Sequence, residues 1–233
     1  TDKSHDLQKD VIEFNQFAAQ QEESQQEQNT KGSGGIFKIV WEILSTLLLA
    51  GLVVFVINTF IFQAYYVSGN SMNPDYHDGD YVLANKFPTT ARNIAGLFGK
   101  KPNIDVKRGD VLIFHPPYDE SIFYIKRVIG LPGDRVVLKD GKFTIYNSQY
   151  PNGLQLNEPY IDPAYKTQFE VDEVVLDGNL FMVGDNRSPG GSYDSREWGQ
   201  LNQNKILGTV FFRLLPINDL GIISGMNYSA AQP

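Results

Sequence analysis

Ser71, in the stretch GNSMNPDYHDGD at residues 69–80, is a candidate nucleophile. The residues before it read as a strand, and Gly69 and Asn70 tolerate the backbone angles of a tight turn. A serine at such a junction exposes its hydroxyl near backbone N–H groups, which acyl transfer needs in order to stabilise an oxyanion. Serines in stretches rich in glycine and asparagine are usually ordinary turn residues, so this stretch alone leaves both interpretations open.

Lys126, in SIFYIKRVIGLPGD, is the strongest candidate for the base that a serine nucleophile needs. If residues 121–129 form a strand, both of its faces are largely apolar, which predicts that the strand is buried. Burial lowers the pKa of a lysine and leaves part of its amine neutral, so that it can accept a serine proton. The alternative is a lysine that reaches solvent at the strand edge. His77 and His115 are other candidate bases, but neither has an evident carboxylate to orient its ring.

The stretch GDNRSPGGSYDSREWG, at residues 184–199, concentrates charged and hydroxyl side chains between glycines and a proline. Two aspartates and two arginines at interleaved spacing can form a hydrogen-bonded ion network that makes a site rigid. The alternative is a solvated polar loop. The residues in question are Asp185, Asn186, Arg187, Ser192, Asp194, Ser195 and Arg196.

The composition excludes several other classes of protein. With 233 residues, 42% of them hydrophobic, the chain can form one globular domain with accessory segments. Its net charge is −7 and it has no run rich in lysine and arginine, so we expect no nucleic-acid partner. It has no cysteine and only three scattered histidines, so we expect no disulfide and no metal site.

Residues 43–62, ILSTLLLAGLVVFVINTFIF, form an uncharged run long enough to cross a bilayer as a helix. A buried core helix rarely stays uncharged over this length, and a cleaved signal peptide would be shorter and nearer the N-terminus. Lys31 and Lys38 precede the run, and no lysine or arginine follows it before Lys86. The positive-inside rule therefore places the N-terminus in the cytoplasm and the rest of the chain outside.

After the apolar run, short β-branched and aromatic segments alternate with turn residues, which predicts a mostly β fold. KDGK at 139–142 indicates a hairpin, and 87–107 is expected to be loop with at most one short helical turn. The fold class is an antiparallel β catalytic domain with a small β accessory subdomain, preceded by one transmembrane helix. The expected divisions are a disordered tail (1–35), the membrane helix (36–62), the catalytic domain (63–133 and 182–217), the accessory subdomain (134–181) and a C-terminal tail (218–233).

Three separated motifs resemble the sequence boxes of bacterial type I signal peptidases, also called leader peptidases. They are SMNP (71–74), RGDVLIF (108–114) with YIKRVIGLPGD (124–134), and GDNR…SYDSR…G (184–199). Their order matches, and so does the apolar span just before the serine, over about residues 43–215. The resemblance implies a serine endopeptidase with Ser71 as nucleophile and Lys126 as general base, without a cofactor.

The resemblance also assigns supporting roles. Ser192 would hydrogen-bond and orient the lysine, with Ser188 as the alternative because the spacing in NRSPGGSYDSR is two residues longer than in the family. Asp75 stands where the family has threonine, and Gly69 where some members have a serine that serves the oxyanion hole. The residues expected to brace the site are Asp194, Arg196, Asp185, Arg187 and Arg127. Those expected to contact an extended substrate are Tyr66, Val67, Ser68, Gly69, Ile122 and Tyr124.

The function implied by the resemblance is removal of signal peptides from exported preproteins. The enzyme would be a monomer held in the bacterial plasma membrane, with a cytoplasmic N-terminus and an extracytoplasmic catalytic domain. Its partners would be preproteins and the lipid bilayer. Two alternatives have distinct signatures: a self-cleaving regulator with the same Ser/Lys chemistry, and a catalytically silent, membrane-anchored domain that binds peptides.

Overall fold

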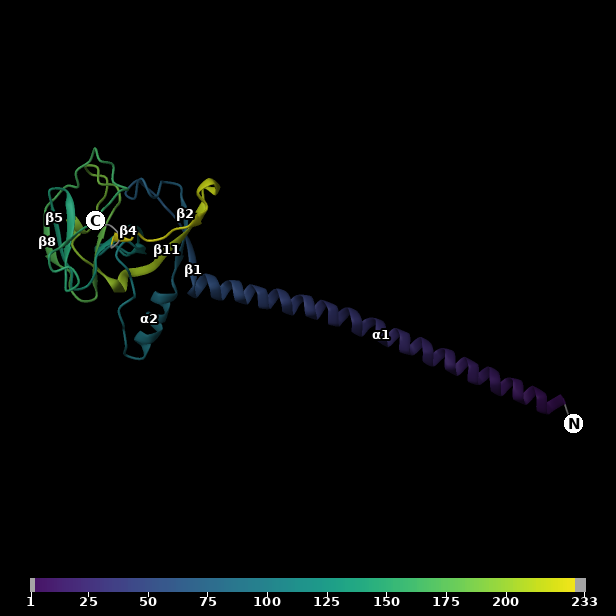
Figure 1. Ribbon diagram of the computed structural model, residues 1–233. Helices are drawn as coiled ribbons and strands as arrows, with labels where there is room; N and C mark the ends of the chain where they lie inside the picture. Colours follow the sequence, from purple (N-terminus) through teal and green to yellow (C-terminus); the bar gives the residue numbers. More distant parts are fainter. Residues whose placement is uncertain (1–2, 229–233) are drawn as a thin grey trace. The chain divides into compact units, whose positions relative to one another are not determined.

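A computed structural model describes residues 3–228, with the side chains of residues 15–23 and 35–228 inside that range (Figure 1). The chain divides into two compact units, Thr1–Phe55 and Val56–Pro233. The first unit is helical, and the second carries the β-sheets. Each unit is described by itself.

A single long helix, α1 (Lys3–Phe60), makes up the described part of the first unit and enters the second. Gly35–Phe60 is long and apolar enough to cross a membrane, at about 39 Å for 26 residues, and its most apolar window is not buried. The helix ends two residues before the predicted end of the span, because Phe62 begins β1 (Phe62–Tyr66). The segment predicted to be disordered, or at most a frayed helix, is helical from Lys3 onward, and glutamine, glutamate and alanine are good helix formers even at low sequence complexity.

The larger sheet of the second unit is antiparallel and carries the candidate site. Its strands run in the order β1-β2-β11-β3-β4-β9-β10, with β12 paired to β11. In β4, residues 126–130 are all buried, as predicted for a strand covered on both faces. The remaining strands are β2 (Tyr81–Asn85), β3 (Val111–Phe114), β4 (Tyr124–Gly130), β9 (Asn179–Val183), β10 (Leu201–Asn202), β11 (Ile206–Leu215) and β12 (Gly221–Ile222).

The smaller sheet has four strands in the order β7-β6-β5-β8. They are β5 (Arg135–Lys139), β6 (Lys142–Tyr146), β7 (Leu154–Gln155) and β8 (Val171–Val174). Asp140 and Gly141 both have positive φ, at 54° and 80°, and join β5 to β6 in the two-residue hairpin predicted from KDGK. The mostly antiparallel β fold is therefore confirmed.

Helices are few in the second unit. They are α2 (Phe87–Leu97), α3 (Ser195–Trp198) and the short 3₁₀ turns η1 (Gln203–Lys205) and η2 (Ile217–Asp219). The prediction of loop at 87–107 is wrong for α2. The helix buries Thr89 and Arg92 rather than apolar residues, so its sequence lacks the usual apolar period that points to a core.

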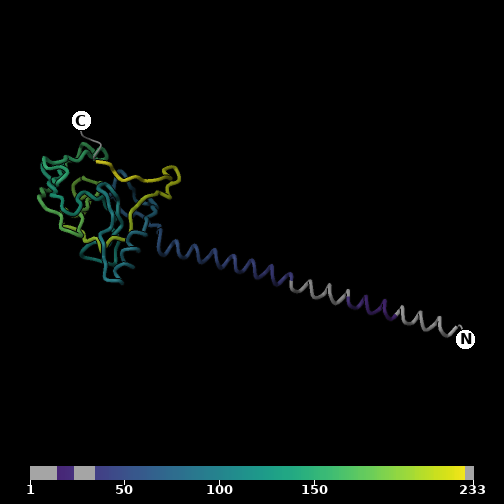
Figure 2. The backbone as a smooth tube through the Cα atoms, turned by 60° about the horizontal axis from the view of Figure 1, so that its bottom comes forward, coloured from purple at the N-terminus to yellow at the C-terminus, as the bar shows by residue number. Residues whose placement is uncertain are grey.

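The segment after β11 was predicted to be a tail, but it packs on the β domain as far as it is described. β12 pairs with β11, and the Met226 N–H donates to the Gly109 carbonyl at 3.2 Å. Tyr228 is buried in the core cluster beneath the smaller sheet. Figures 1 and 2 show this segment, in yellow, returning toward that sheet.

Candidate active site

Ser71 and Lys126 lie in direct contact, although 55 residues separate them in the chain. The Lys126 Nζ is 2.5 Å from the Ser71 Oγ, within hydrogen-bonding distance. Ser71 stands in a loop whose ends are tied together, since the Val67 N–H donates to Asp80 and the Gly79 N–H donates to Val67. A serine and an amine at this distance can exchange a proton directly.

The amine of Lys126 is buried on β4, with only 3% of the residue exposed. A lysine that reaches solvent at a strand edge is therefore the wrong description. Burial lowers the pKa of Lys126 to about 8, while the charges of Asp194 and Asp185 offset part of that effect. A substantial fraction of the amine is neutral near physiological pH, as a general base requires.

Ser192 lies beside this pair, and Gly184 fits between its side chain and the nucleophile loop. A Cβ at Gly184 would lie 2.2 Å from the Ser192 Oγ and 2.4 Å from the Ser71 carbonyl oxygen, so only glycine fits there. The Ser192 hydroxyl donates to Asp194 at 2.8 Å. Within residues 35–228, the predicted hydrogen bond from Ser192 to Lys126 is not formed. Ser188, the alternative, instead donates to Asn186 at 2.6 Å.

Asp194 anchors the turn that carries Ser192. The guanidinium of Arg196 meets both of its carboxylate oxygens at 2.8 Å, and the Gly184 N–H adds a third contact at 3.0 Å. Burial alone raises the pKa of Asp194, but the ion pair with Arg196 outweighs it and holds that pKa below its ordinary value. The carboxylate therefore stays charged and keeps the loop fixed.

Arg127 joins three segments of the site. It meets Asp185 through two bonds of 2.8 and 2.6 Å, and it meets Asp75, in the nucleophile loop, at 2.7 Å. Burial alone lowers the pKa of Arg127, but the bonds and charge of Asp185 raise it above its ordinary value. Asp75 is thus part of the ion network, a role that its position in the sequence did not reveal.

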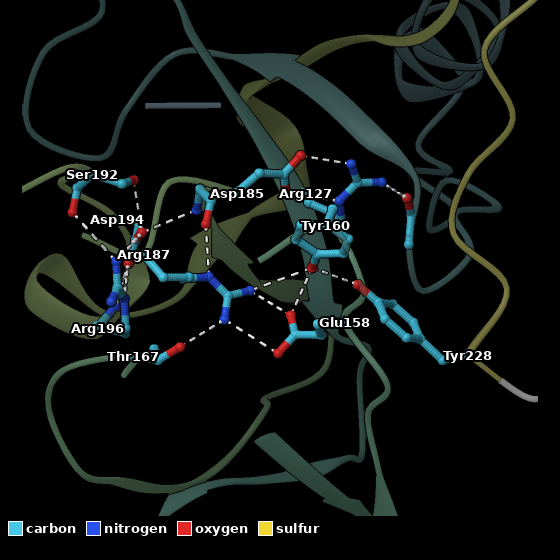
Figure 3. Close-up of polar contacts among 12 residues, drawn as sticks. Arg127, Glu158, Tyr160, Thr167, Asp185, Arg187, Ser192, Asp194, Arg196 and Tyr228 are labelled. Carbon is cyan, nitrogen blue, oxygen red and sulfur yellow. Dashed lines mark hydrogen bonds and ion pairs between the residues drawn. The ribbon is translucent and has the colours of Figure 1, made fainter. Parts of the chain in front are cut away.

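Arg187 bonds to groups outside the predicted network (Figure 3). Its Nε donates to the Gly184 carbonyl at 2.8 Å, and its Nη atoms reach Glu158 and Thr167. Tyr160 stands next in this chain of contacts, with its hydroxyl 2.9 Å from that of Tyr228. Three further members of the network, Glu158, Tyr160 and Tyr228, were missed, because nothing in the sequence relates their separate segments to the GDNR loop.

A cleft of about 650 Å³ opens beside the Ser71–Lys126 pair. Five of the six residues predicted to contact substrate line it, namely Tyr66, Val67, Ser68, Gly69 and Tyr124. Ile122 does not line it and was wrongly predicted, because β4 begins only at Tyr124. Gly190, Gly191 and Tyr193 also line the cleft and were missed.

The histidines lie away from this chemistry. His77 is exposed in the turn after the nucleophile, and the ring of His115 contacts the Ile122 carbonyl and Phe123. In the part of the chain that the structure describes, no group of three or more potential ligands could hold a metal ion.

Comparisons with known proteins show the family of the chain. A family model described as "Signal peptidase, peptidase S26" matches residues 40–215. The chain belongs to this signal peptidase family. Signal peptidase I of Bacillus licheniformis is 32% identical over 205 residues, which cover 84% of this chain and 97% of the relative. Signal peptidase I of Bacillus caldolyticus is 35% identical over 178 residues, which cover 70% and 85%.

A solved structure is also similar to this signal peptidase family member. It is the crystal structure of a signal peptidase I from Enterococcus faecalis V583, 25% identical, with a TM-score of 0.37. The match covers 46% of this chain and 98% of that one. Family membership makes the chain a peptidase of the class that removes signal peptides.

Proposed function

We propose that this signal peptidase is a membrane-anchored serine endopeptidase that cleaves preproteins through an acyl-enzyme on Ser71. The observation that carries the proposal is the 2.5 Å contact between the Ser71 Oγ and a buried lysine amine of lowered pKa. An unpaired lysine is rarely buried for stability, so its position needs a functional reason.

The proposed reaction begins with the neutral amine of Lys126. As the Ser71 Oγ attacks the scissile carbonyl carbon, the hydroxyl proton moves to the Lys126 Nζ. The resulting ammonium gives that proton to the amine of the leaving peptide, which departs as the C–N bond breaks. A water molecule then attacks the acyl carbon and gives a proton to the Lys126 Nζ, which passes that proton to the Ser71 Oγ as the ester C–O bond breaks and the carboxyl product leaves. The Ser71 backbone N–H is proposed as a donor to the oxyanion.

The surrounding residues hold this pair in position. Ser192, fixed by Asp194 and Arg196, is proposed to accept a hydrogen bond from Lys126 when the amine is protonated. Arg127 and Asp185 hold the strand of the base, and Arg187 holds the adjacent GDNR loop. Because catalysis depends on placement within a fraction of an ångström, such rigid ion pairs suit the role.

The substrate is proposed to bind as an extended peptide in the cleft beside β1 and β4. The backbone of Ser68 and the Gly69 carbonyl are proposed to pair with the peptide there, and Tyr66 and Tyr124 line the cleft with their side chains. Both members of the dyad and the cleft come from one chain, so a monomer suffices. Neither a metal ion nor a cofactor takes part in the proposed steps.

The membrane anchor is proposed to be Gly35–Phe60, whose length and composition suit a bilayer. Lys31 and Lys38 precede the span, and the next basic residue after it is Lys86. The proposed orientation therefore has a cytoplasmic N-terminus and a catalytic domain on the extracytoplasmic face of a bacterial plasma membrane.

The test is cleavage of a purified preprotein in detergent or vesicles, with the cleavage site mapped by mass spectrometry. Ser71→Ala and Lys126→Ala are expected to abolish cleavage, while the exposed control His77→Ala and the addition of a chelator leave it unchanged. Cleavage at the native rate by either dyad variant would refute the assignment. Cutting of the enzyme itself without a preprotein would favour the self-cleaving regulator. Failure of a penem to acylate Ser71 would favour a silent binding domain.

A further inference from the structure

Tyr228 lies in the segment that follows β11, and only 3% of the residue is exposed. It belongs to the core cluster that also contains Ile129 and Phe143. A tyrosine buried among apolar side chains needs a hydrogen-bond partner for its hydroxyl. Here the partner is the Tyr160 hydroxyl, 2.9 Å away, which belongs to the ion network of the candidate active site. The contact therefore joins the C-terminal segment to that network.

The two hydroxyls belong to a chain of hydrogen bonds with a fixed direction (Figure 3). Tyr160 donates its hydroxyl proton to the Glu158 carboxylate at 2.6 Å. Tyr228 must therefore be the donor in its contact with Tyr160, since a hydroxyl has a single proton to give. Burial raises the pKa of Tyr228 above its ordinary value, so its hydroxyl keeps that proton. Glu158 in turn forms an ion pair with the guanidinium of Arg187.

Arg187 continues this chain of hydrogen bonds to the backbone beside the dyad. Its Nε donates to the Gly184 carbonyl at 2.8 Å. Gly184 lies between the Ser192 side chain and the Ser71 carbonyl, where no Cβ fits. A shift of Arg187 would therefore move the backbone that separates the nucleophile loop from Ser192. Because hydrogen bonds in a buried chain strengthen one another, the Tyr228 hydroxyl can affect the placement of Gly184.

The same segment also contacts the groups that hold Arg127. The Met226 N–H donates at 3.2 Å to the Gly109 carbonyl, which accepts a second bond of 2.9 Å from the Arg127 Nη1. Gly109 has a φ of 92°, and a Cβ there would lie 2.0 Å from the Met226 carbonyl oxygen, so only glycine permits this approach. The guanidinium of Arg127 also lies 4.9 Å from the centre of the Tyr160 ring. The supports of both arginines are therefore in contact with the C-terminal segment.

Between β11 and Met226 the segment is largely exposed. Ile217 is 75% exposed and Ile222 is 80% exposed. A cavity of about 590 Å³ lies where residues 224–228 pass Lys107 and Gln149. The contacts of Met226 and Tyr228 with the network are therefore the ones that fix this part of the chain.

We propose that Tyr228 is a positioning residue of the active site, and that the segment it anchors holds Arg187 and Arg127 where the reaction needs them. The inference rests on the catalytic dyad proposed above. Tyr228 does not line the cleft, so it acts through Tyr160 rather than on the substrate. Loss of its hydroxyl should therefore slow the chemical step in fully folded enzyme without weakening substrate binding.

The test is Tyr228→Phe in the full-length protein, which removes the hydroxyl and leaves the ring in the core. For each variant, kcat and KM for a preprotein are measured well below its thermal unfolding temperature. The expected result is that kcat falls by roughly three- to tenfold while KM stays unchanged. Tyr150→Phe is the matched control and should keep the native kcat, since Tyr150 packs against the same core cluster but outside this chain of hydrogen bonds.

A second variant shows whether the effect passes through Tyr160. Tyr160→Phe should lower kcat at least as much as Tyr228→Phe, and combining the two should lower kcat by less than about twofold further. Native kcat in Tyr228→Phe, with Ser71→Ala inactive, would overturn the inference alone, even if the unfolding temperature falls. Full additivity of the two changes would also overturn it. Cleavage by Ser71→Ala would overturn the proposed function, and the inference with it.

Discussion

Lys126 and Arg127 are neighbours on β4, and both are buried, but they lie on opposite faces in opposite electrostatic surroundings. The amine of Lys126 contacts a neutral hydroxyl, and burial lowers its pKa to about 8. The guanidinium of Arg127 contacts two carboxylates, and its pKa is raised. Lys126 lies on the face of β4 that lines the cleft, which we call the cleft face, and it can lose its proton. Arg127 lies on the opposite face, which we call the network face, and its ion pairs keep it protonated.

One strand therefore carries both the residue proposed as the base, Lys126, and a residue whose ion pairs hold the surrounding loops, Arg127. A lysine paired directly with a carboxylate would stay protonated and could not accept a proton from serine. Asp194 faces the site, but its two oxygens are occupied by Arg196, Ser192 and the Gly184 N–H. The paired charges thus hold the loops while leaving Lys126 without a direct counter-ion.

The largest effect is expected from removing the base. Lys126→Met should lower kcat/KM for a preprotein by roughly 10⁴-fold, because among the described residues Lys126 is the base that contacts the Ser71 hydroxyl. Lys126→Arg should be as inactive, because a guanidinium keeps its proton. Steady-state cleavage assays measure both. An active arginine variant would show that position 126 supplies a positive charge rather than a base. It would contradict the difference drawn between Lys126 and Arg127.

The next effect concerns the network face. Arg127→Met should lower the free energy of unfolding by about 3–5 kcal/mol, because it leaves Asp185 buried without its counter-ion. Chemical denaturation in detergent measures this loss. The exposed pair of Arg135 with Asp172 is the control, and Arg135→Met should cost far less stability than Arg127→Met, because water screens the exposed pair. Equal losses at the two arginines would show that the buried network does not brace the site.

Lys126→Met should also stabilise the protein, by about 3 kcal/mol at pH 7. The folded pKa of about 8 lies below the ordinary 10.5, so the lysine destabilises the fold fully below pH 8. That penalty fades between pH 8 and 10.5, and the gain from methionine should shrink over the same range. Denaturation at pH 7 and pH 10 measures the change, with exposed Lys139→Met as the control. A destabilised methionine variant at pH 7 would contradict the unfavourable burial of the amine.

The smallest effect is expected at the exposed end of the network. Asp75→Asn removes one charge of the pair with Arg127, but the Asp75 side chain is 35% exposed, so water compensates for much of the loss. The expected cost is about 0.5–1 kcal/mol of stability, with a modest fall in kcat. Thermal unfolding and cleavage assays measure it against Asp105→Asn on the exposed surface. A loss of stability as large as that of Arg127→Met would show that Asp75, rather than Asp185, is the main counter-ion of Arg127.

The sequence predicted the dyad because its members sit in short local motifs whose residue types reveal their role. SMNP indicated the proposed nucleophile, and a lysine on an apolar strand indicated the proposed base. The residues that were missed depend on contacts between distant segments. Glu158 and Tyr228 join the network only through the fold, and no pattern in their own segments indicates this.

The fold was predicted where strands alternate with turns, and it was missed where packing overrides the local pattern. The helix α2 escaped prediction because its buried positions are polar. The C-terminal segment was taken for a tail because it has only a two-residue strand, yet a tertiary core buries Tyr228. Ile122 was placed in the cleft because the strand was expected to begin three residues earlier than Tyr124.

The pH dependence of Ser71 acylation tests the central claim most directly. A penem-type acylating inhibitor is mixed with the full-length enzyme from pH 6 to pH 10, and the rate of Ser71 modification is followed by mass spectrometry. Because the neutral amine is the base, the rate should rise about tenfold per pH unit below 8 and level off above it. A flat profile, or a rise that continues to the ordinary lysine pKa near 10.5, would contradict a buried, neutral Lys126.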